Sequence, residues 1–205
     1  MVFLTLLPLL QLFLFYHSIG GNPKGLKIGI VDEEITSYNE CLNTSLITTF
    51  VHDSACDLHK ISCRVLNEIT DDIATKVFFD NIDDAYKEAR KGNLIGIIYF
   101  ASNFSESLNY LHYSEDEIDM QTRKNSIINI YLDQTNQQLT YFLQRRLYDV
   151  YKDYSENVLI DCGLPKKLDN IPIQFLEPIY GSYDTDFKHT MVPPFIMLIM
   201  FYVRF

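Results

Sequence analysis

The contrast between two apolar ends and a mixed middle is the feature that most constrains how this chain can fold. Residues 2–19 are almost uniformly apolar, and residues 191–203 contain no charged side chain. Apolar runs of this kind either pack inside a protein core or enter a membrane, because their exposure to water is unfavourable. We therefore expect a folded middle with a hydrophobic segment on each side.

The first apolar run is about 18 residues long, which is just enough to span a bilayer as a helix. It predicts a transmembrane helix, or a signal-anchor, over residues 1–19. A secretory signal peptide cut near residues 18–21 is the alternative. No Lys or Arg follows Met1 in this run, and the run is longer than a usual signal core; both points favour the membrane span. The missing basic flank leaves the orientation of the span open.

The second apolar run is about 13 residues long, or roughly 20 Å of helix, whereas a bilayer core is roughly 30 Å thick. We interpret residues 188–205 as the start of a second transmembrane helix, and a hydrophobic core helix is the alternative. A turn is predicted just before it, because Pro178 fixes φ and Gly181 can take a positive φ. Pro193 and Pro194 complete this junction between the domain and the apolar run.

Strand and helix patterns alternate through the middle of the chain, residues 20–187. Apolar residues at helical spacing, with Asn81 or Asp80 before one helix and Gly92 after it, predict helices between the strands. This alternation favours an α/β fold with a mixed or mostly parallel sheet and flanking helices. The predicted strands are residues 26–31, 75–79, 94–100, 127–133 and 171–175, and the predicted helices lie near residues 81–92, 103–113 and 136–159.

Four cysteines lie in this middle region, at Cys41, Cys56, Cys63 and Cys162. Cysteines of a domain outside the cell commonly form disulfides, so we expect at least one, involving Cys162 and one of the other three. If Cys56 and Cys63 lay on one straight helix, they would be two turns apart and could not be bridged to each other. Four cysteines can pair in three ways, and the sequence does not select one of them.

A zinc site is an alternative role for part of this region. On one helix, His52, Cys56, His59 and Cys63 would share a face. Spread along three turns, however, they would cover more than about 15 Å, which is too far for one ion unless the helix kinks. We therefore favour disulfides over a metal site.

Two glycosylation acceptor motifs, at Asn43 and Asn103, are candidate modification sites. Asn103 follows a predicted strand at a predicted surface turn, which suits an attached glycan.

Several functional classes find no support in the sequence. The net charge of −10 and the pI of about 4.8 disfavour binding to nucleic acid, whose phosphates need a basic surface. There is no phosphate loop for ATP, no nucleophile elbow and no zinc-protease motif. The acidic residues at 32–34 and 114–119 are interpreted as solvated loops. We expect no catalytic, metal or cofactor site in this chain.

The order of motifs near the end of the chain resembles a known junction. The strand candidate IPIQF is followed by EPIYG, a short polar spacer, MVPP and an apolar run. This order resembles the segment before the second transmembrane helix of ABC-2 type permeases, in half-transporters of ABC subfamilies G and H. The family usually has Ala-Pro-Gly where this chain has Val192-Pro193-Pro194, so the start of that helix differs. Residues 26–34, 92–108 and 126–138 also match, and the resemblance covers nearly the whole chain.

The resemblance implies the membrane-spanning and extracellular part of an ATP-driven exporter in the plasma membrane, which is not itself an enzyme. It implies three partners: the lipid bilayer, an ABC ATPase domain that alone would bind ATP, and a second half-transporter in a homodimer or heterodimer. Residues 20–187 would be an extracellular domain, and lipids or xenobiotics are the implied substrates. The alternatives are a secreted or membrane-anchored, disulfide-bonded binding glycoprotein and a soluble enzyme with buried apolar ends.

Overall fold

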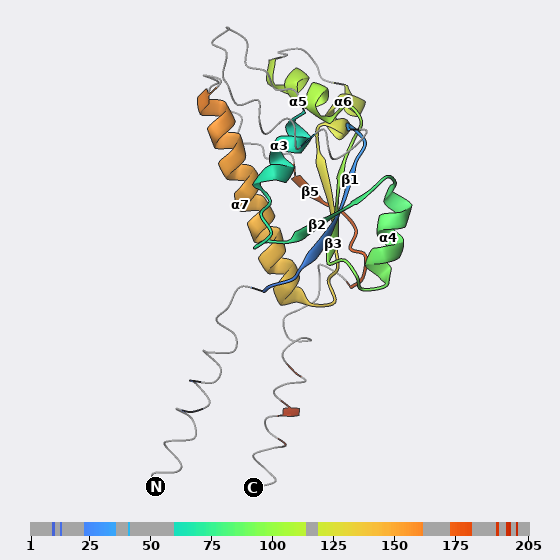
Figure 1. The fold of residues 1–205 in the computed structure, drawn as a ribbon, viewed down its shortest axis with the longest axis vertical. Coiled ribbons are helices and arrows are strands. Elements are labelled where there is room, and N and C mark those ends of the chain that lie inside the picture. Colours follow the sequence, from blue (N-terminus) through green and yellow to red (C-terminus); the bar gives the residue numbers. More distant parts are fainter. Residues whose placement is uncertain are drawn as a thin grey trace.

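The computed structural model describes residues 23–35, 60–113, 119–161 and 173–181, with single residues at 10, 13, 41, 192, 196, 197 and 200. They form a five-stranded sheet with helices packed on both faces (Figure 1). The strands are β1 Lys27–Asp32, β2 Thr75–Phe79, β3 Gly96–Phe100, β4 Ile128–Leu132 and β5 Ile173–Phe175. The helices are α3 Ile61–Glu68, α4 Ile82–Arg90, α5 Phe104–Tyr113, α6 Met120–Asn125 and α7 Gln137–Asp161.

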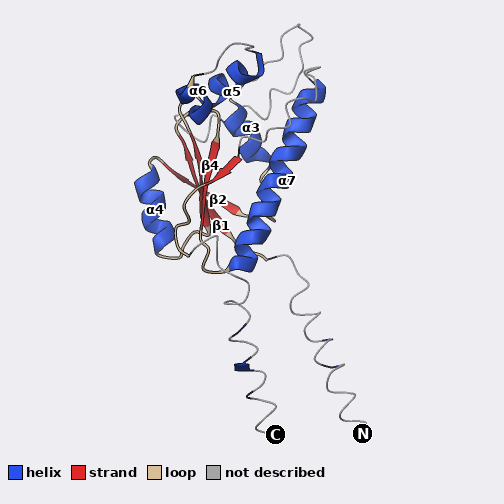
Figure 2. Cartoon of the chain, turned by 180° about the vertical axis from the view of Figure 1, so that it is seen from behind, coloured by secondary structure: helices blue, strands red, loops and turns tan. Residues whose placement is uncertain are grey.

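The strand order in the sheet is β2-β1-β3-β4-β5. β1 is parallel to both β2 and β3, β4 is antiparallel to β3, and β5 is parallel to β4. The sheet is therefore mixed and mostly parallel, which confirms the predicted fold class. The crossovers through α3 and α4 run in opposite directions along the sheet, so right-handed connections place these helices on opposite faces. Figure 2 shows α4 on one side of the sheet and α3 with α7 on the other.

The two faces of the sheet bury unequal cores. α3, α5 and α7 cover the larger core, to which β1 contributes the fully buried Ile28 and Ile30. α4 covers the smaller core with Ala85 and Ala89, and β1 contributes Val31 to it. β1 serves both cores because successive residues of a strand point to opposite faces. Burial of each large apolar side chain contributes about 1.5–3 kcal/mol.

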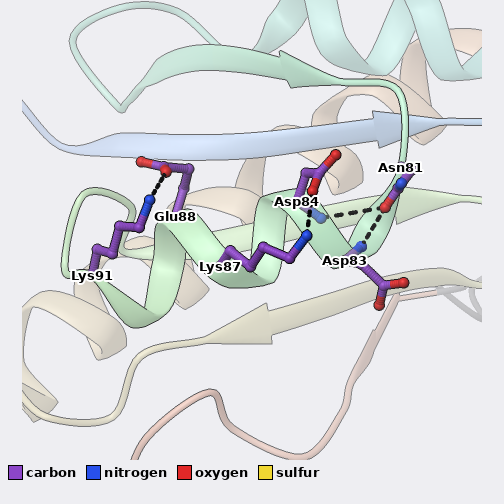
Figure 3. Close-up of polar contacts among 6 residues, drawn as sticks. All are labelled: Asn81, Asp83, Asp84, Lys87, Glu88 and Lys91. Atoms are coloured by element: carbon purple, nitrogen blue, oxygen red, sulfur yellow. Dashed lines mark hydrogen bonds and ion pairs between the residues drawn. The ribbon is translucent and has the colours of Figure 1, made fainter.

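Helix α4 has the two ends that its sequence predicts (Figure 3). The side-chain oxygen of Asn81 accepts from the backbone N–H of Asp83 at 2.7 Å and from that of Asp84 at 3.3 Å. At the other end, Gly92 adopts a φ of +77° and its N–H donates to the carbonyl of Ala89 at 2.9 Å. This left-handed residue ends the helix and satisfies carbonyls of its last turn.

The exposed side of α4 carries two ion pairs. Lys87 pairs with Asp84 at 2.7 Å, and Lys91 pairs with Glu88 at 2.6 Å (Figure 3). Each pair joins residues three apart on a solvated helix surface, where such pairs contribute a few tenths of a kcal/mol. The pairs support the helix and provide no binding site.

Helices α3 and α6 are the two described helices that are missing from the predicted set. We expected a solvated loop over residues 114–119, but Asp119 accepts from the N–H of Thr122 at 3.2 Å and begins α6. Residues 114–118 lie outside the described residues. The other predicted strands and helices are present, with bounds that differ by a few residues at their ends.

Candidate functional site

The chain enters and leaves the domain at one edge of the sheet, which we call the junction edge and define by Leu26, Lys27, Ile95, Asp133 and Tyr180. The carbonyl of Lys27 accepts from Ile95 N at 2.8 Å, and the carbonyl of Ile95 accepts from Asp133 N at 2.8 Å. Asp133 and Tyr180 form an isolated parallel bridge. These contacts cross β1, β3 and β4 in turn, so Leu26, before the first strand, and Tyr180, after the last, lie along the same edge.

Figure 1 shows the start of β1 and the start of α7 at this end of the sheet, whereas α5 and α6 lie at the opposite end. We call that opposite end the far edge and define it by Asp32 and Phe100, where β1 and β3 finish.

The predicted turn before the second apolar run is fixed firmly to the junction edge. The N–H of Ile179 donates to the carbonyl of Leu132 at 3.0 Å, and the N–H of Gln134 donates to the carbonyl of Tyr180 at 2.9 Å. The Tyr180 hydroxyl also donates to the carbonyl of Arg90, at the end of α4, at 3.1 Å. Strand β4, the β4–α7 connection and α4 therefore all hold this turn.

Gly181 follows in the left-handed region, with φ of +82°. A Cβ at this position would lie 2.7 Å from the Cβ of Gln134 and 3.1 Å from its carbonyl carbon. The turn that we predicted from Pro178 and Gly181 is thus one in which glycine is required both by φ and by space. Pro193 and Pro194 lie outside the described residues.

The described side chains of the two apolar ends are exposed rather than packed on the domain. Phe13 is 67% exposed and Met197 is 78% exposed; Leu10, Val192, Ile196 and Met200 are exposed as well. Nothing in the described part of either end joins the hydrophobic cores of the domain. Among the described residues, no helix has both the length and the apolar character needed to cross a bilayer. Most of the two predicted spans lies outside those residues.

At the far edge, Glu34 joins the beginnings of two helices. One carboxylate oxygen accepts from the N–H of Ser105 at 3.0 Å, and the other accepts from the hydroxyls of Ser105 at 2.9 Å and Ser62 at 2.8 Å. The Ser105 hydroxyl in turn accepts from the N–H of Ile61, the first residue of α3, at 2.7 Å. A carboxylate in this position also interacts favourably with the positive end of the α5 dipole.

This network corrects the interpretation of residues 32–34 as solvated loop residues. Glu33 is exposed, but Asp32 and Glu34 are half-buried and hydrogen-bonded. The reason is tertiary, because the serines that bind Glu34 are 28 and 71 residues away in sequence. Both carboxylate oxygens of Glu34 accept hydrogen bonds from the two serines. Glu34 therefore serves as a structural connection and is poorly placed for catalysis.

Burial raises the pKa of the Asp32 carboxyl from 3.8 to about 6, while the N–H of Glu34 acts in the opposite direction. That N–H donates to Asp32 Oδ1 at 2.9 Å. The neighbouring Glu34 charge adds to the increase in pKa. The far edge thus contains a carboxyl group that titrates in the mildly acidic range.

A disulfide joins Cys41 to Cys63, with the two Cα atoms 5.1 Å apart. At least one disulfide was expected, and this one is present, but its pairing does not involve Cys162. Cys56 and Cys162 lie outside the described residues. Because Cys63 is bonded to Cys41, it cannot act as the thiolate zinc ligand that the alternative required.

Other predicted site residues are only partly described. No group of three or more His, Cys, Asp or Glu side chains that could hold a metal occurs in the part of the chain that the structure describes. His52, His59 and Asn43 lie outside it. Asn103 is exposed between β3 and α5, at the far edge of the sheet, and its glycosylation stays a prediction.

Comparisons with known proteins agree with one another. A family model described as ABC-2 family transporter protein matches residues 1–205. The chain is also similar to ABC transporter G family member 20 of Dictyostelium discoideum, with 23% identity over 205 residues. That match covers 97% of this chain and 23% of the relative, so the chain spans about a quarter of the relative's length. No solved structure matches the chain.

Proposed function

The chain belongs to the ABC-2 family of transporter proteins, and on this premise we propose that it supplies the membrane-spanning and extracellular part of an ATP-driven exporter. The α/β domain stands outside the plasma membrane, between a first transmembrane helix and the start of a second. An ABC ATPase domain in the full-length protein binds and hydrolyses the ATP. A second half-transporter, identical or related, completes the pathway for the substrate.

The shared junction edge is the observation that carries this proposal. A domain inserted between two helices of one membrane must receive and return its chain on the side that faces the bilayer. Leu26 and Tyr180 lie along one edge of the sheet, connected through Ile95 and Asp133. The two apolar runs then leave the domain from the same side, as the topology requires.

Two further observations support the placement. The described apolar side chains of both ends are exposed, which suits a lipid environment and argues against the soluble enzyme with buried ends. The Cys41–Cys63 disulfide suits an oxidising compartment, as expected for a domain outside the cell.

Within the proposed exporter this chain has no catalytic role. It carries no phosphate loop, and the polar cluster around Glu34 is committed to holding α3 and α5. Its contribution is to anchor the external domain rigidly above the membrane helices through the turn at Tyr180 and Gly181.

Glycosylation of Asn103 tests the topology. This residue is exposed at the far edge, so the proposed orientation places it well away from the bilayer. We expect expression in a glycosylating host to add a glycan that glycosidase removes, and the Asn103→Gln variant to lack it. If Asn103 stays unmodified and the domain is protected from external protease, the proposed topology is wrong.

Reconstitution tests the division of labour. Liposomes that contain the 205-residue chain alone should neither hydrolyse ATP nor transport, whereas a full-length half-transporter with its ATPase domain should do both. ATP-dependent transport by the chain alone would overturn the proposal.

A secreted or surface-anchored binding glycoprotein is the second candidate, and the Cys41–Cys63 disulfide is compatible with it. Under that alternative the first apolar run is a signal peptide. Sequencing of the mature protein distinguishes the two, because a terminus near Gly20 supports the secreted form and retention of residues 1–19 supports the exporter.

A further inference from the structure

A pocket of about 420 Å³ opens at the junction edge, between the starts of β1, β3 and α7. Its lining includes Leu26, Lys27, Ile95, Asp133 and Leu139. The volume falls within the range of pockets that bind small molecules. The proposed function assigns no role to this pocket.

The walls of the pocket are formed by rigid parts of the fold. Ile95 N donates to the Lys27 carbonyl, and Asp133 N donates to the Ile95 carbonyl, each at 2.8 Å. Gly25 and Gly92 also line the pocket, and no atom lies within 4 Å of the position that a Cβ would occupy on either. The pocket is thus preformed on one side and open at its glycine turns. Because the walls do not have to be ordered by a ligand, less conformational entropy is lost on binding.

The pocket presents one positive and one negative side chain. Lys27 is exposed and forms no ion pair within the described part of the chain. Asp133 Oδ1 accepts hydrogen bonds from both the N–H and the hydroxyl of Thr135. Its Oδ2 is therefore left for a ligand. Strand β3 separates the two residues, so their backbones are roughly 10 Å apart, and the long lysine side chain can shorten that distance.

We propose that this pocket binds the headgroup of a zwitterionic phospholipid from the surrounding bilayer. Lys27 binds the phosphate, Asp133 binds the positively charged ammonium group, and Leu26 and Leu139 contact the glycerol carbons. The inference rests on the proposed function, because the junction edge must face the membrane for a lipid headgroup to reach it.

The pairing of charges favours a lipid headgroup over a free anion. A free phosphate would use Lys27 alone and would be repelled by Asp133, whereas a zwitterion satisfies both. The apolar lining would gain nothing from an inorganic ion but is buried by the glycerol region of a lipid. The junction edge is also the part of the domain that the proposed topology brings to the depth of the headgroups.

The test uses native mass spectrometry of the 205-residue chain in detergent, titrated with phosphatidylcholine or phosphatidylglycerol. We expect Lys27→Gln to weaken binding of the most tightly held phosphatidylcholine about fivefold, which is the effect of losing one solvated charge contact. Lys124→Gln, an exposed lysine on α6 at the far edge, is the matched control and should change nothing. Asp133→Asn keeps the Oδ1 acceptor for Thr135, and it should remove the preference for phosphatidylcholine over phosphatidylglycerol, which has no ammonium group.

Two results would overturn the pocket assignment: equal binding by the wild-type chain and by Lys27→Gln, or displacement of the lipid by millimolar inorganic phosphate. Alkaline extraction of the chain from liposomes tests the membrane placement separately, so that failure of the pocket assignment can be told from failure of the proposed function. A chain that resists extraction but binds lipid independently of Lys27 refutes the pocket alone. A chain that is extracted refutes the membrane placement, and binding that needs Lys27 and Asp133 still supports the pocket.

Discussion

Replacement of Gly181 by alanine tests whether the junction turn is as constrained as its geometry indicates. Gly181 has φ of +82°, and a Cβ there would lie 2.7 Å from Gln134 Cβ. Gly92 provides the matched control, because its φ of +77° is nearly the same but its Cβ position is open. Both substitutions share the cost of a left-handed alanine and the reduced freedom of the unfolded chain, so their difference isolates the steric term.

The expected magnitudes follow from these two sites. Gly92→Ala should destabilise by about 1 kcal/mol through its backbone conformation. Gly181→Ala adds the close contact with Gln134, which cannot move aside easily because its N–H donates to the carbonyl of Tyr180 at 2.9 Å. Overpacking of this kind costs about 1–3 kcal/mol, so the total should be about 2–4 kcal/mol. A difference of about 2 kcal/mol lowers Tm by about 4–8 °C in a domain of this size.

The assay is thermal and denaturant unfolding of the chain in detergent micelles, followed by far-UV circular dichroism because the sequence contains no Trp. Gly181→Ala should unfold at a clearly lower temperature and denaturant concentration than Gly92→Ala. Gly181→Val should also lower surface expression more than Gly92→Ala does. Gln134→Gly, which removes the Cβ in conflict, should recover part of the loss in the double variant. Equal midpoints for Gly181→Ala and Gly92→Ala would refute the steric argument.

Three other predictions address separate parts of the domain. Lys76 donates from Nζ to the carbonyls of Leu66 and Ile69, at the end of α3, at 2.8 and 2.7 Å. Lys76→Met should therefore destabilise the domain by about 1–2 kcal/mol in denaturant unfolding, and an unchanged midpoint would count against this role of Lys76. Reduction of the Cys41–Cys63 disulfide, which spans 22 residues, should lower stability by about 3 kcal/mol, and mass mapping under non-reducing conditions should find this pair. Because the pKa of Asp32 is raised from 3.8 to about 6, its contribution to stability is complete below pH 3.8 and is lost as the pH rises through 6, a change of about 2–3 kcal/mol. Relative to Asp32→Asn, the wild type should therefore lose stability between about pH 4 and about pH 6.5 and change little above that range, and parallel curves would exclude this assignment.

Local sequence signals were sufficient for most elements of the sheet and its helices. The strand TKVFF is present with the predicted bounds, because β-branched and aromatic residues between turn residues leave few alternatives. Helix α4 was predicted from its apolar spacing and from Asn81 and Gly92, and the structure uses both as caps. These features depend on neighbours in sequence, which is why a single sequence reveals them.

The features that the sequence did not reveal depend on residues far apart. Glu34 looked like a solvated acid because Ser62 and Ser105, its partners, belong to other elements. A disulfide was expected from the number of cysteines, but the pairing of Cys41 with Cys63 depends on where α3 begins. The cap at Asp119 was obscured by the run of acidic residues around it, which suggested a loop rather than a helix start.

The reversed strand β4 brings the entry and the exit of the domain to the same edge of the sheet, as the proposed insertion between two membrane segments requires. In an all-parallel sheet every strand starts at one edge and ends at the other, so the chain would leave the domain at the edge opposite to the one where it entered. Here α5 and α6 both stay at the far edge after β3 (Figure 1), and β4 therefore runs back antiparallel to it. Helix α7 then returns the chain to the far edge, and β5, parallel to β4, ends towards Tyr180 at the junction edge. One antiparallel pair, between β3 and β4, thus places the exit beside the start of β1, which is the arrangement that the proposed topology requires.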